Sequence, residues 1–207
     1  MIKRAFDLLC VVIALPLVAP CMALIGLAVA LGHDGPVFFR QVRVGRNREP
    51  FTIIKFRTMR HRPAGAIDQA REAVVTDTRD ERITRVGRFL RATSLDELPQ
   101  IINVLGGTMS LVGPRPLIPE QLSAVPEGFG QRFAVRPGIT GWAQVNGRRS
   151  LGWLRQLELD VWYVEHRSLW LDICILLKTV MVVLKRSGVY GTTEDNWRAY
   201  LDSKERT

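Results

Sequence analysis

The sequence predicts an α+β protein, with an N-terminal re-entrant membrane helix followed by a compact, helix-rich cytosolic domain with a few short strands and interfacial helices. Three observations lead to this prediction: an uncharged apolar stretch at residues 8–31, a strand-like pair of segments at residues 36–59, and later segments whose apolar residues recur with helical spacing. We expect the membrane helix at 1–32, the cytosolic domain at 33–190 and a C-terminal tail at 191–207.

The apolar stretch at residues 8–31 is long enough to enter a membrane deeply. As a helix it would be about 36 Å long, against about 30 Å for the hydrocarbon core of a bilayer. Three interpretations compete: a signal peptide, a spanning helix and a re-entrant helix. Lys3, Arg4 and the "AVA" at 28–30 fit a signal peptide, whereas Asp7 and the internal prolines weaken that interpretation.

Charge favours the re-entrant interpretation over the spanning one. Basic residues flank both ends of the stretch, and the positive-inside tendency places both flanks in the cytoplasm. A straight span cannot satisfy that tendency. Pro16 and Pro20 supply a bend, because each lacks an N–H group and clashes with the carbonyl four residues earlier.

Composition narrows the class of partner. The chain has 29 Lys and Arg against 20 Asp and Glu, a net charge of +9, which indicates nucleic acid, anionic lipid or a phosphorylated substrate, although a plain basic surface gives the same charge. The 3 cysteines are far apart and form no CxxC, so neither a zinc site nor a redox pair is indicated. No GxxxxGK[ST] motif is present, which excludes a P-loop enzyme.

Residues 36–59 predict two short strands around a Gly-Arg-Asn turn. The second, "FTIIKFRTM" at 51–59, roughly alternates after its apolar start and places Lys55 and Arg57 on one strand face. Two basic residues on a strand are equally typical of a solvated face.

Apolar spacing predicts further helices at residues 80–92, 98–107, 151–167 and 168–188. Residues 61–81 are expected to form a loop. In the first of these helices Arg82, Arg85, Arg88 and Arg91 recur every third residue, which fits lipid headgroups as well as substrate, and Arg91 lies beside an acidic pair. The last helix is interrupted by Asp172 and Lys178, so we expect it in the core or along the membrane interface.

A rigid turn follows a strand-like piece at residues 108–117. Arg115 lies between Pro114 and Pro116, each with a fixed φ. A rigid backbone under an arginine suits a phosphate fork, and equally a surface turn. Residues 136–148 predict a loop, a short strand and a turn.

Asp96 and Glu97 form the acidic pair, and two interpretations stay open. Ser94 to Glu97 matches the S-x-x-E capping box, yet Pro99 conflicts with a helix that begins at Ser94, so Asp96 is an alternative cap. The other interpretation is chemical: both carboxylates could approach one Mg²⁺, and one of them could attack phosphorus. Nearby cations could then hold the phosphate oxygens; the candidates are Lys55, Arg57, Arg91 and Arg115.

Three motifs carry a resemblance: "SLDELPQIINVLGGTMSLVGPRPL", "VRPGITGWAQVNGR" and "FTIIKFRTM". They resemble the bacterial sugar transferases, and more narrowly the small monotopic phosphoglycosyl transferases, over nearly the whole chain. The resemblance implies transfer of a sugar-1-phosphate from a UDP-sugar to polyprenyl (undecaprenyl) phosphate with release of UMP, which initiates glycoconjugate or exopolysaccharide assembly. It also implies Mg²⁺ and a location at the cytoplasmic face of the bacterial inner membrane, with both ends of the anchor helix cytoplasmic.

The resemblance also assigns roles to residues. Asp96 is implied to be the nucleophile that forms a covalent phospho-sugar intermediate, and Glu97 its partner, at the metal or in proton transfer. Asp160, in "LELDVWY", matches a family motif, with a structural role as good an explanation. The implied contacts to substrate phosphate are Lys55, Arg57, Arg91 and Arg115, with Arg136 and Arg148 as weaker candidates for phosphate or uridine.

One alternative is a membrane-tethered basic binding or scaffold protein without catalysis. No recognised nucleic-acid motif is present, so we expect no nucleic-acid partner. A homodimer is compatible with the sequence. The tail at 191–207 matches the family little, and we expect it to order on substrate or stay loose.

Overall fold

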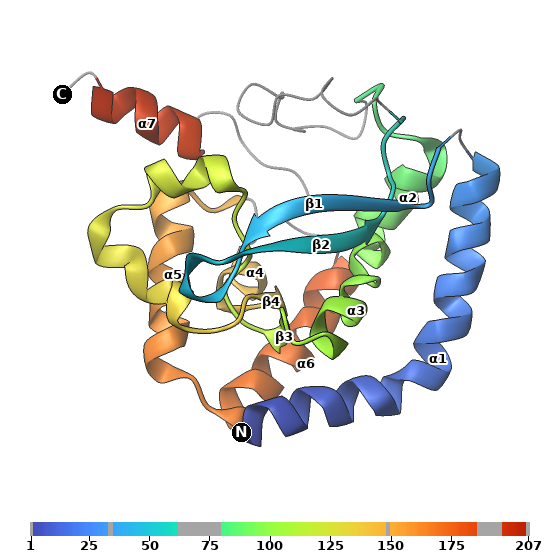
Figure 1. Ribbon diagram of the computed structural model, residues 1–207, viewed down its shortest axis with the longest axis horizontal. Coiled ribbons are helices and arrows are strands. Elements are labelled where there is room, and N and C mark those ends of the chain that lie inside the picture. Colours follow the sequence, from blue (N-terminus) through green and yellow to red (C-terminus); the bar gives the residue numbers. More distant parts are fainter. Residues whose placement is uncertain (1, 33–34, 62–79, 148–149, 186–195, 206–207) are drawn as a thin grey trace.

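The computed structural model describes residues 2–32, 35–61, 80–147, 150–185 and 196–205 (Figure 1). Over these residues the chain is helix-rich with a few short strands, as predicted. In chain order the helices, 3₁₀ helices (η) and strands are α1 (Ile2–Gly32), β1 (Phe38–Val44), η1 (Arg46–Arg48), β2 (Pro50–Phe56), α2 (Arg85–Thr93), η2 (Leu95–Glu97), α3 (Gln100–Leu105), β3 (Ser110–Val112), η3 (Pro119–Ala124), η4 (Glu127–Ala134), β4 (Gly138–Thr140), α4 (Trp142–Val145), α5 (Trp153–His166), α6 (Leu169–Lys185) and α7 (Trp197–Glu205).

Helix α1 lies along the outside of the protein as two arms joined by a bend (Figure 1). Pro16 and Pro20 lie inside the helix and explain the bend. The first arm contacts α3 and β3, and the second contacts α2. Among the described helices, only α1 is long and apolar enough to cross a membrane.

Each arm of α1 buries an inward-facing valine. Val11 packs in a cluster with Ile53 of β2 and Met109, and Val29 packs with Phe56 and Leu90. The side that faces away from the domain is apolar and exposed; its large side chains include Ile13, Leu17, Leu24, Leu27 and Leu31. Both ends of α1 are therefore fixed to the same body, while its outer face has apolar surface that water does not favour.

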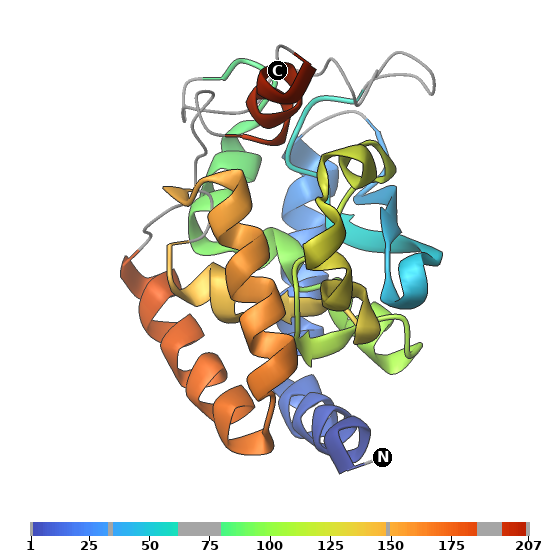
Figure 2. The same ribbon diagram turned by 90° about the vertical axis from the view of Figure 1, so that its left-hand side faces the viewer.

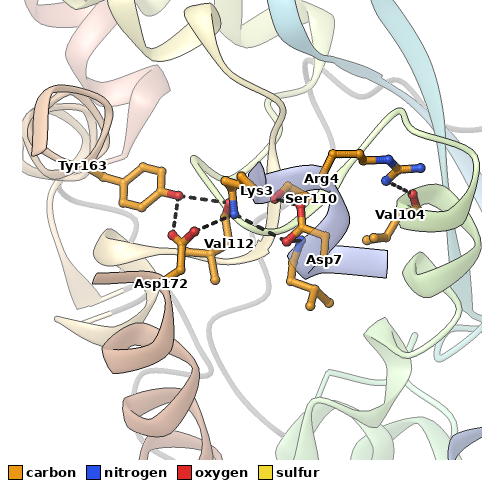
Figure 3. A network of polar contacts seen from close by, with 9 residues as sticks. Lys3, Arg4, Asp7, Val104, Ser110, Val112, Tyr163 and Asp172 are labelled. Carbon is orange, nitrogen blue, oxygen red and sulfur yellow. Dashed lines mark hydrogen bonds and ion pairs between the residues drawn. The ribbon is translucent and has the colours of Figure 1, made fainter. Parts of the chain in front are cut away.

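A network of charged and polar groups fixes the start of α1 (Figure 3). Lys3 forms an ion pair with Asp172 of α6, with 2.8 Å between Nζ and Oδ2. Asp7 is buried and accepts a hydrogen bond from the Ser110 hydroxyl at 2.7 Å. Tyr163 of α5 donates to Asp172 at 2.7 Å, so α1, β3, α5 and α6 meet at this network.

The predicted pair of strands is confirmed. β1 and β2 form an antiparallel hairpin in which Phe38 lies opposite Phe56 and Val44 opposite Pro50. The turn between them contains Asn47 at a φ of 56°, a left-handed conformation that asparagine tolerates well.

A second, parallel pair joins β3 to β4, with Ser110 opposite Gly138 and Val112 opposite Thr140. The Val44 amide donates to the Leu117 carbonyl at 2.8 Å, which ties the hairpin to the segment after β3. The segment that contains Arg115 is therefore held at both ends.

Helices α5 and α6 confirm the predictions for residues 151–167 and 168–188. They run side by side in Figure 2, and Tyr163 and Ile175 pack against Val112 of β3 in one cluster. The outer side of α6 has exposed apolar residues; they are Trp170, Leu177, Val180, Met181 and Leu184.

Two elements were not predicted. Residues 142–145 form the short helix α4 between the predicted strand and the predicted turn, which is present at residues 146–147, and α4 contacts both α5 and α6. Residues 196–205 were expected to order on substrate or stay loose, but α7 is a helix whose Trp197, Tyr200 and Leu201 pack against the cluster around Trp153. These partly buried apolar contacts hold α7 against the rest of the domain. Most of the predicted loop at 61–81 lies outside the described residues.

Candidate active site

The acidic pair lies in the 3₁₀ turn η2, between α2 and α3. Ser94 has a φ of 58° and ends α2 as its left-handed C-cap. The capping-box prediction is therefore wrong: the Ser94 side chain makes no cap hydrogen bond, and Pro99 precedes α3. The alternative with Asp96 as the cap also fails, because Asp96 lies inside η2.

Glu97 is held between two cations. Its Oε1 accepts from Lys55 Nζ at 2.6 Å and from Arg115 Nη2 at 2.8 Å. The Lys55 and Glu97 side chains are only 13% and 17% exposed, so water screens this pair weakly. Lys55 comes from β2 and Arg115 from the segment after β3, so the site joins parts of the chain that lie 42 and 18 residues from Glu97.

The charged groups of this cluster shift one another's pKa values. Burial lowers the pKa of Lys55 to about 8, against the opposing effect of Glu97. Burial alone would raise the pKa of Glu97, but Arg115 and Lys55 outweigh it and hold that pKa well below its usual range. Asp96 raises the pKa of both Lys55 and Arg115, so its carboxylate lies within electrostatic reach of the same cations.

Glu97 is therefore expected to be an anion near neutral pH. Its role in this geometry is to hold Lys55 and Arg115 beside Asp96. A phosphate group approaching Asp96 would meet two cations whose positions are already set, which is the preorganisation that favours developing charge.

Two of the other predicted basic residues, Arg57 and Arg136, make their contacts outside this cluster. Arg57 contacts His61 and the Phe38 carbonyl. Arg136 donates from Nε to the Gly107 carbonyl at 2.6 Å, at the end of α3. Arg91 lies in the last turn of α2, and its positive charge helps to lower the pKa of Asp80. Arg148 lies outside the described residues.

Arg132 is a site residue that sequence reasoning missed. It is buried, it pairs with Asp160 at 2.6 Å, and it donates to the Arg115 carbonyl at 2.8 Å. In the sequence it is one arginine among many, in a segment with no strong periodicity. The available signal was Asp160, an acid flanked by Leu159 and Val161 in a helix, which needs a partner if it is buried.

The donor set fits Mg²⁺ only together with substrate. Within the part of the chain that the structure describes, no group of three or more His, Cys, Asp or Glu side chains could hold a metal. Mg²⁺ typically takes one or two carboxylates and completes its shell with phosphate and water. Asp96 and Glu97 are the two carboxylates of the site that could meet this requirement, and the Oε1 of Glu97 also accepts from Lys55 and Arg115.

Comparison with known proteins now decides the family. A family model described as bacterial sugar transferase matches residues 1–186. The chain belongs to this family. It is 44% identical over 200 residues to a Bacillus subtilis protein named uncharacterized sugar transferase EpsL, covering 92% of this chain and 91% of that protein.

Two relatives have more specific names. An Escherichia coli protein named UDP-glucose:undecaprenyl-phosphate glucose-1-phosphate transferase is 43% identical over 198 residues, which cover 92% of this chain and 42% of that protein. A Salmonella typhimurium protein named undecaprenyl-phosphate galactose phosphotransferase is 40% identical over 202 residues, which cover 91% of this chain and 42% of that protein. Membership of the family supports an enzyme and does not favour the alternative of a non-catalytic scaffold.

Proposed function

We propose that this protein transfers a sugar-1-phosphate from a UDP-sugar to polyprenyl phosphate, such as undecaprenyl phosphate, and releases UMP, thereby initiating glycoconjugate or exopolysaccharide assembly. The observation that carries the proposal is the Lys55–Glu97–Arg115 cluster beside Asp96, in a chain whose relatives are named for this reaction. Two part-buried cations close to a carboxylate suit attack of that carboxylate on a phosphate group.

In the first half-reaction, an Asp96 carboxylate oxygen attacks the phosphorus that bears the sugar. The new O–P bond forms as the phosphoanhydride bond breaks, and UMP leaves with the bonding electrons. In the second, an oxygen of polyprenyl phosphate attacks the same phosphorus and the Asp96 carboxylate is released. Asp96 is thus the group that ends the cycle unchanged.

Lys55 and Arg115 would hold the phosphate oxygens during both steps, because both already lie against the neighbouring Glu97. When bound, Mg²⁺ would neutralise diphosphate charge, with Asp96 and Glu97 as its protein ligands. Arg57 and Arg136 make their contacts outside the cluster, so any substrate contact they make is to more distant parts of the donor or to lipid phosphate.

We infer that α1 is re-entrant and that the domain lies on the cytoplasmic face of the bacterial inner membrane. Support comes from the bend at the two prolines, from the exposed apolar outer face, and from the packing of both arms on one domain. The exposed apolar face of α6 suits a helix that lies along the interface. This arrangement would bring the site to a lipid-linked acceptor.

The test is UMP release from a panel of UDP-sugars with polyprenyl phosphate and Mg²⁺. Wild-type protein should turn over with at least one UDP-sugar, and Asp96→Asn should lose activity by about a thousandfold or more, as for other nucleophile removals. Without acceptor, radiolabelled phospho-sugar should stay on wild-type protein and be absent from Asp96→Asn. Full turnover by Asp96→Asn would rule Asp96 out as the nucleophile.

A further inference from the structure

A buried ion pair lies behind the site. Arg132 in η4 and Asp160 in α5 are each 3% exposed. Two nitrogens of Arg132 donate to the same oxygen of Asp160, Nη2 at 2.6 Å and Nε at 3.3 Å. Neither residue contacts Asp96 or Glu97 in this arrangement, so neither is a catalytic residue.

The same Nη2 of Arg132 reaches the site through the backbone. It donates to the carbonyl oxygen of Arg115 at 2.8 Å, while the guanidinium of Arg115 donates to Glu97, also at 2.8 Å. A continuous chain of contacts therefore runs from Asp160 through Arg132 to the backbone of Arg115, and from its side chain to Glu97.

The Arg115 carbonyl is well placed to control this backbone. Both neighbours, Pro114 and Pro116, lack an N–H group, so the backbone beside Arg115 has few hydrogen bonds with which to hold itself. The nearest anchors are the Pro114 carbonyl, which accepts from the Gly138 amide at 3.0 Å, and the Pro116 carbonyl, which accepts from Arg43 Nη1 at 3.4 Å. Between these two anchors, the contact from Arg132 fixes the peptide plane from which the Arg115 side chain projects.

A contribution to folding stability does not by itself explain the Arg132–Asp160 ion pair. Burial raises the pKa of Asp160 in spite of Arg132, which means that the carboxylate is costly to keep charged. Among the residues that the structure describes, the second oxygen of Asp160, Oδ1, has no hydrogen-bond partner. Buried ion pairs are often no more stabilising than apolar residues of similar size. The better explanation for this pair is that it positions the backbone of Arg115.

We propose that Asp160 and Arg132 are positioning residues that fix the Arg115 carbonyl and so keep the Arg115 guanidinium on Glu97. The proposal rests on the proposed function only in predicting that loss of this contact slows transfer. Its geometric half, that Asp160 controls the Arg115–Glu97 ion pair, stands without catalysis.

The kinetic test is a double-mutant cycle between Asp160→Asn and Arg115→Gln. Asp160→Asn should lower kcat/KM for sugar-phosphate transfer by about ten- to a hundredfold, which is the scale of small misplacements in active sites. If Asp160 acts through Arg115, it should lower kcat/KM by less than about twofold when Arg115 is already Gln. Additive losses, or an Asp160→Asn enzyme with wild-type kinetics, would overturn the proposal.

Two variants of α5 serve as matched controls. Glu158 is exposed and pairs with Arg155, so Glu158→Gln should leave kcat/KM unchanged. Leu157 is 1% exposed in the core, so Leu157→Ala should lower the unfolding midpoint. Its effect on kcat/KM should simply add to that of Arg115→Gln. If Leu157→Ala reproduces the non-additivity, general destabilisation explains the effect and the proposal fails.

A second cycle needs no activity. The coupling between Arg115→Gln and Glu97→Gln in unfolding measurements reports on their ion pair. That coupling should fall by more than about half in the Asp160→Asn background. Unchanged coupling would overturn the inference even if transfer is observed, whereas reduced coupling in a protein that transfers no sugar-phosphate would count against the proposed function alone.

Discussion

Lys55 and Glu97 form a part-buried ion pair in the site, with 2.6 Å between Nζ and Oε1. Lys55 is buried enough for its pKa to fall from 10.5 to about 8, although Glu97 lies 2.6 Å away. Arg115 and Arg43 also lower this pKa, and Asp96 opposes them. A lysine with this pKa loses its proton just above physiological pH. The effect of its charge on the reaction can therefore be measured by varying the pH.

We predict that the transfer reaction loses rate as the pH rises through about 8. Below this pH Lys55 is protonated and supplies positive charge beside Glu97 and the incoming phosphate. Above it the charge is lost, and kcat/KM should fall by about tenfold per pH unit, as for one essential proton. The measurement is the initial rate of UMP release from pH 6 to about 10.

Lys55→Arg is the matched control for this pH dependence. A guanidinium stays protonated over the whole range, so the alkaline fall should move beyond it in this variant. Substrate and metal titrate identically with both enzymes, so any difference belongs to residue 55. An unchanged alkaline fall in an active Lys55→Arg enzyme would assign the proton elsewhere.

At the residue scale, sequence reasoning found the residues whose chemistry is explicit. Lys55, Glu97 and Arg115 were predicted as one cluster and the structure brings them together. Arg57 was placed with Lys55 by strand alternation, but it lies just after β2 ends at Phe56, where alternation no longer holds. Arg132 could not be predicted, because its role depends on a backbone carbonyl and not on any residue type.

At the scale of elements, the parallel pair of β3 and β4 supports the Arg115 segment through very close backbone packing. A Cβ added at Gly138 would lie 2.1 Å from the Gly113 nitrogen and 2.3 Å from the Thr140 carbonyl oxygen. These are backbone atoms and cannot rotate away. Only glycine therefore allows β4 to approach the segment that precedes Pro114 and Arg115.

We predict that Gly138→Ala destabilises the protein by about 1–3 kcal/mol, the usual cost of overpacking. It should also lower kcat/KM, because the strands that hold the Arg115 segment must separate. Gly128→Ala is the control, since no atom lies within 4 Å of its added Cβ, and its effect on stability should stay within about 1 kcal/mol. The measurement is thermal unfolding in detergent together with the transfer rate; equal stability of the two variants would contradict the prediction.

Elements with a long periodic pattern were predictable, and short ones between turns were not. The hairpin and helices α5 and α6 follow their apolar spacing. The capping box failed because Ser94 serves the end of α2 and not the start of the next helix. A four-residue pattern cannot distinguish these roles when one helix ends where the next begins.

At the scale of the whole molecule, α1 packs on the same body as the candidate site. Arg4 donates to the Val104 and Leu105 carbonyls at the end of α3, and Lys3 pairs with Asp172. Sequence reasoning used Lys3 and Arg4 only as topological charges and Asp7 only as an interruption. Apart from the pair that Lys3 and Asp7 form with each other, their partners lie about 100 or more residues away, which no local pattern reveals.

The packing of both arms of α1 on one domain leads to a prediction about topology. Residue 2 is 74% exposed at the start of the first arm, and residue 31 is 80% exposed at the end of the second. If the bent helix enters the membrane and returns, Ile2→Cys and Leu31→Cys should both be shielded from an impermeant thiol reagent added outside spheroplasts. Both should react once the membrane is permeabilised.

These variants are made after Cys10, Cys21 and Cys174 are replaced, so that each protein has one thiol. A periplasmic protein with a known exposed cysteine serves as the positive control for labelling from outside. A straight span would place residue 2 and residue 31 on opposite sides, and one of them would then react in intact spheroplasts. That result would contradict the structure as well as the re-entrant topology, because Lys3 could not reach Asp172 across a bilayer of about 30 Å.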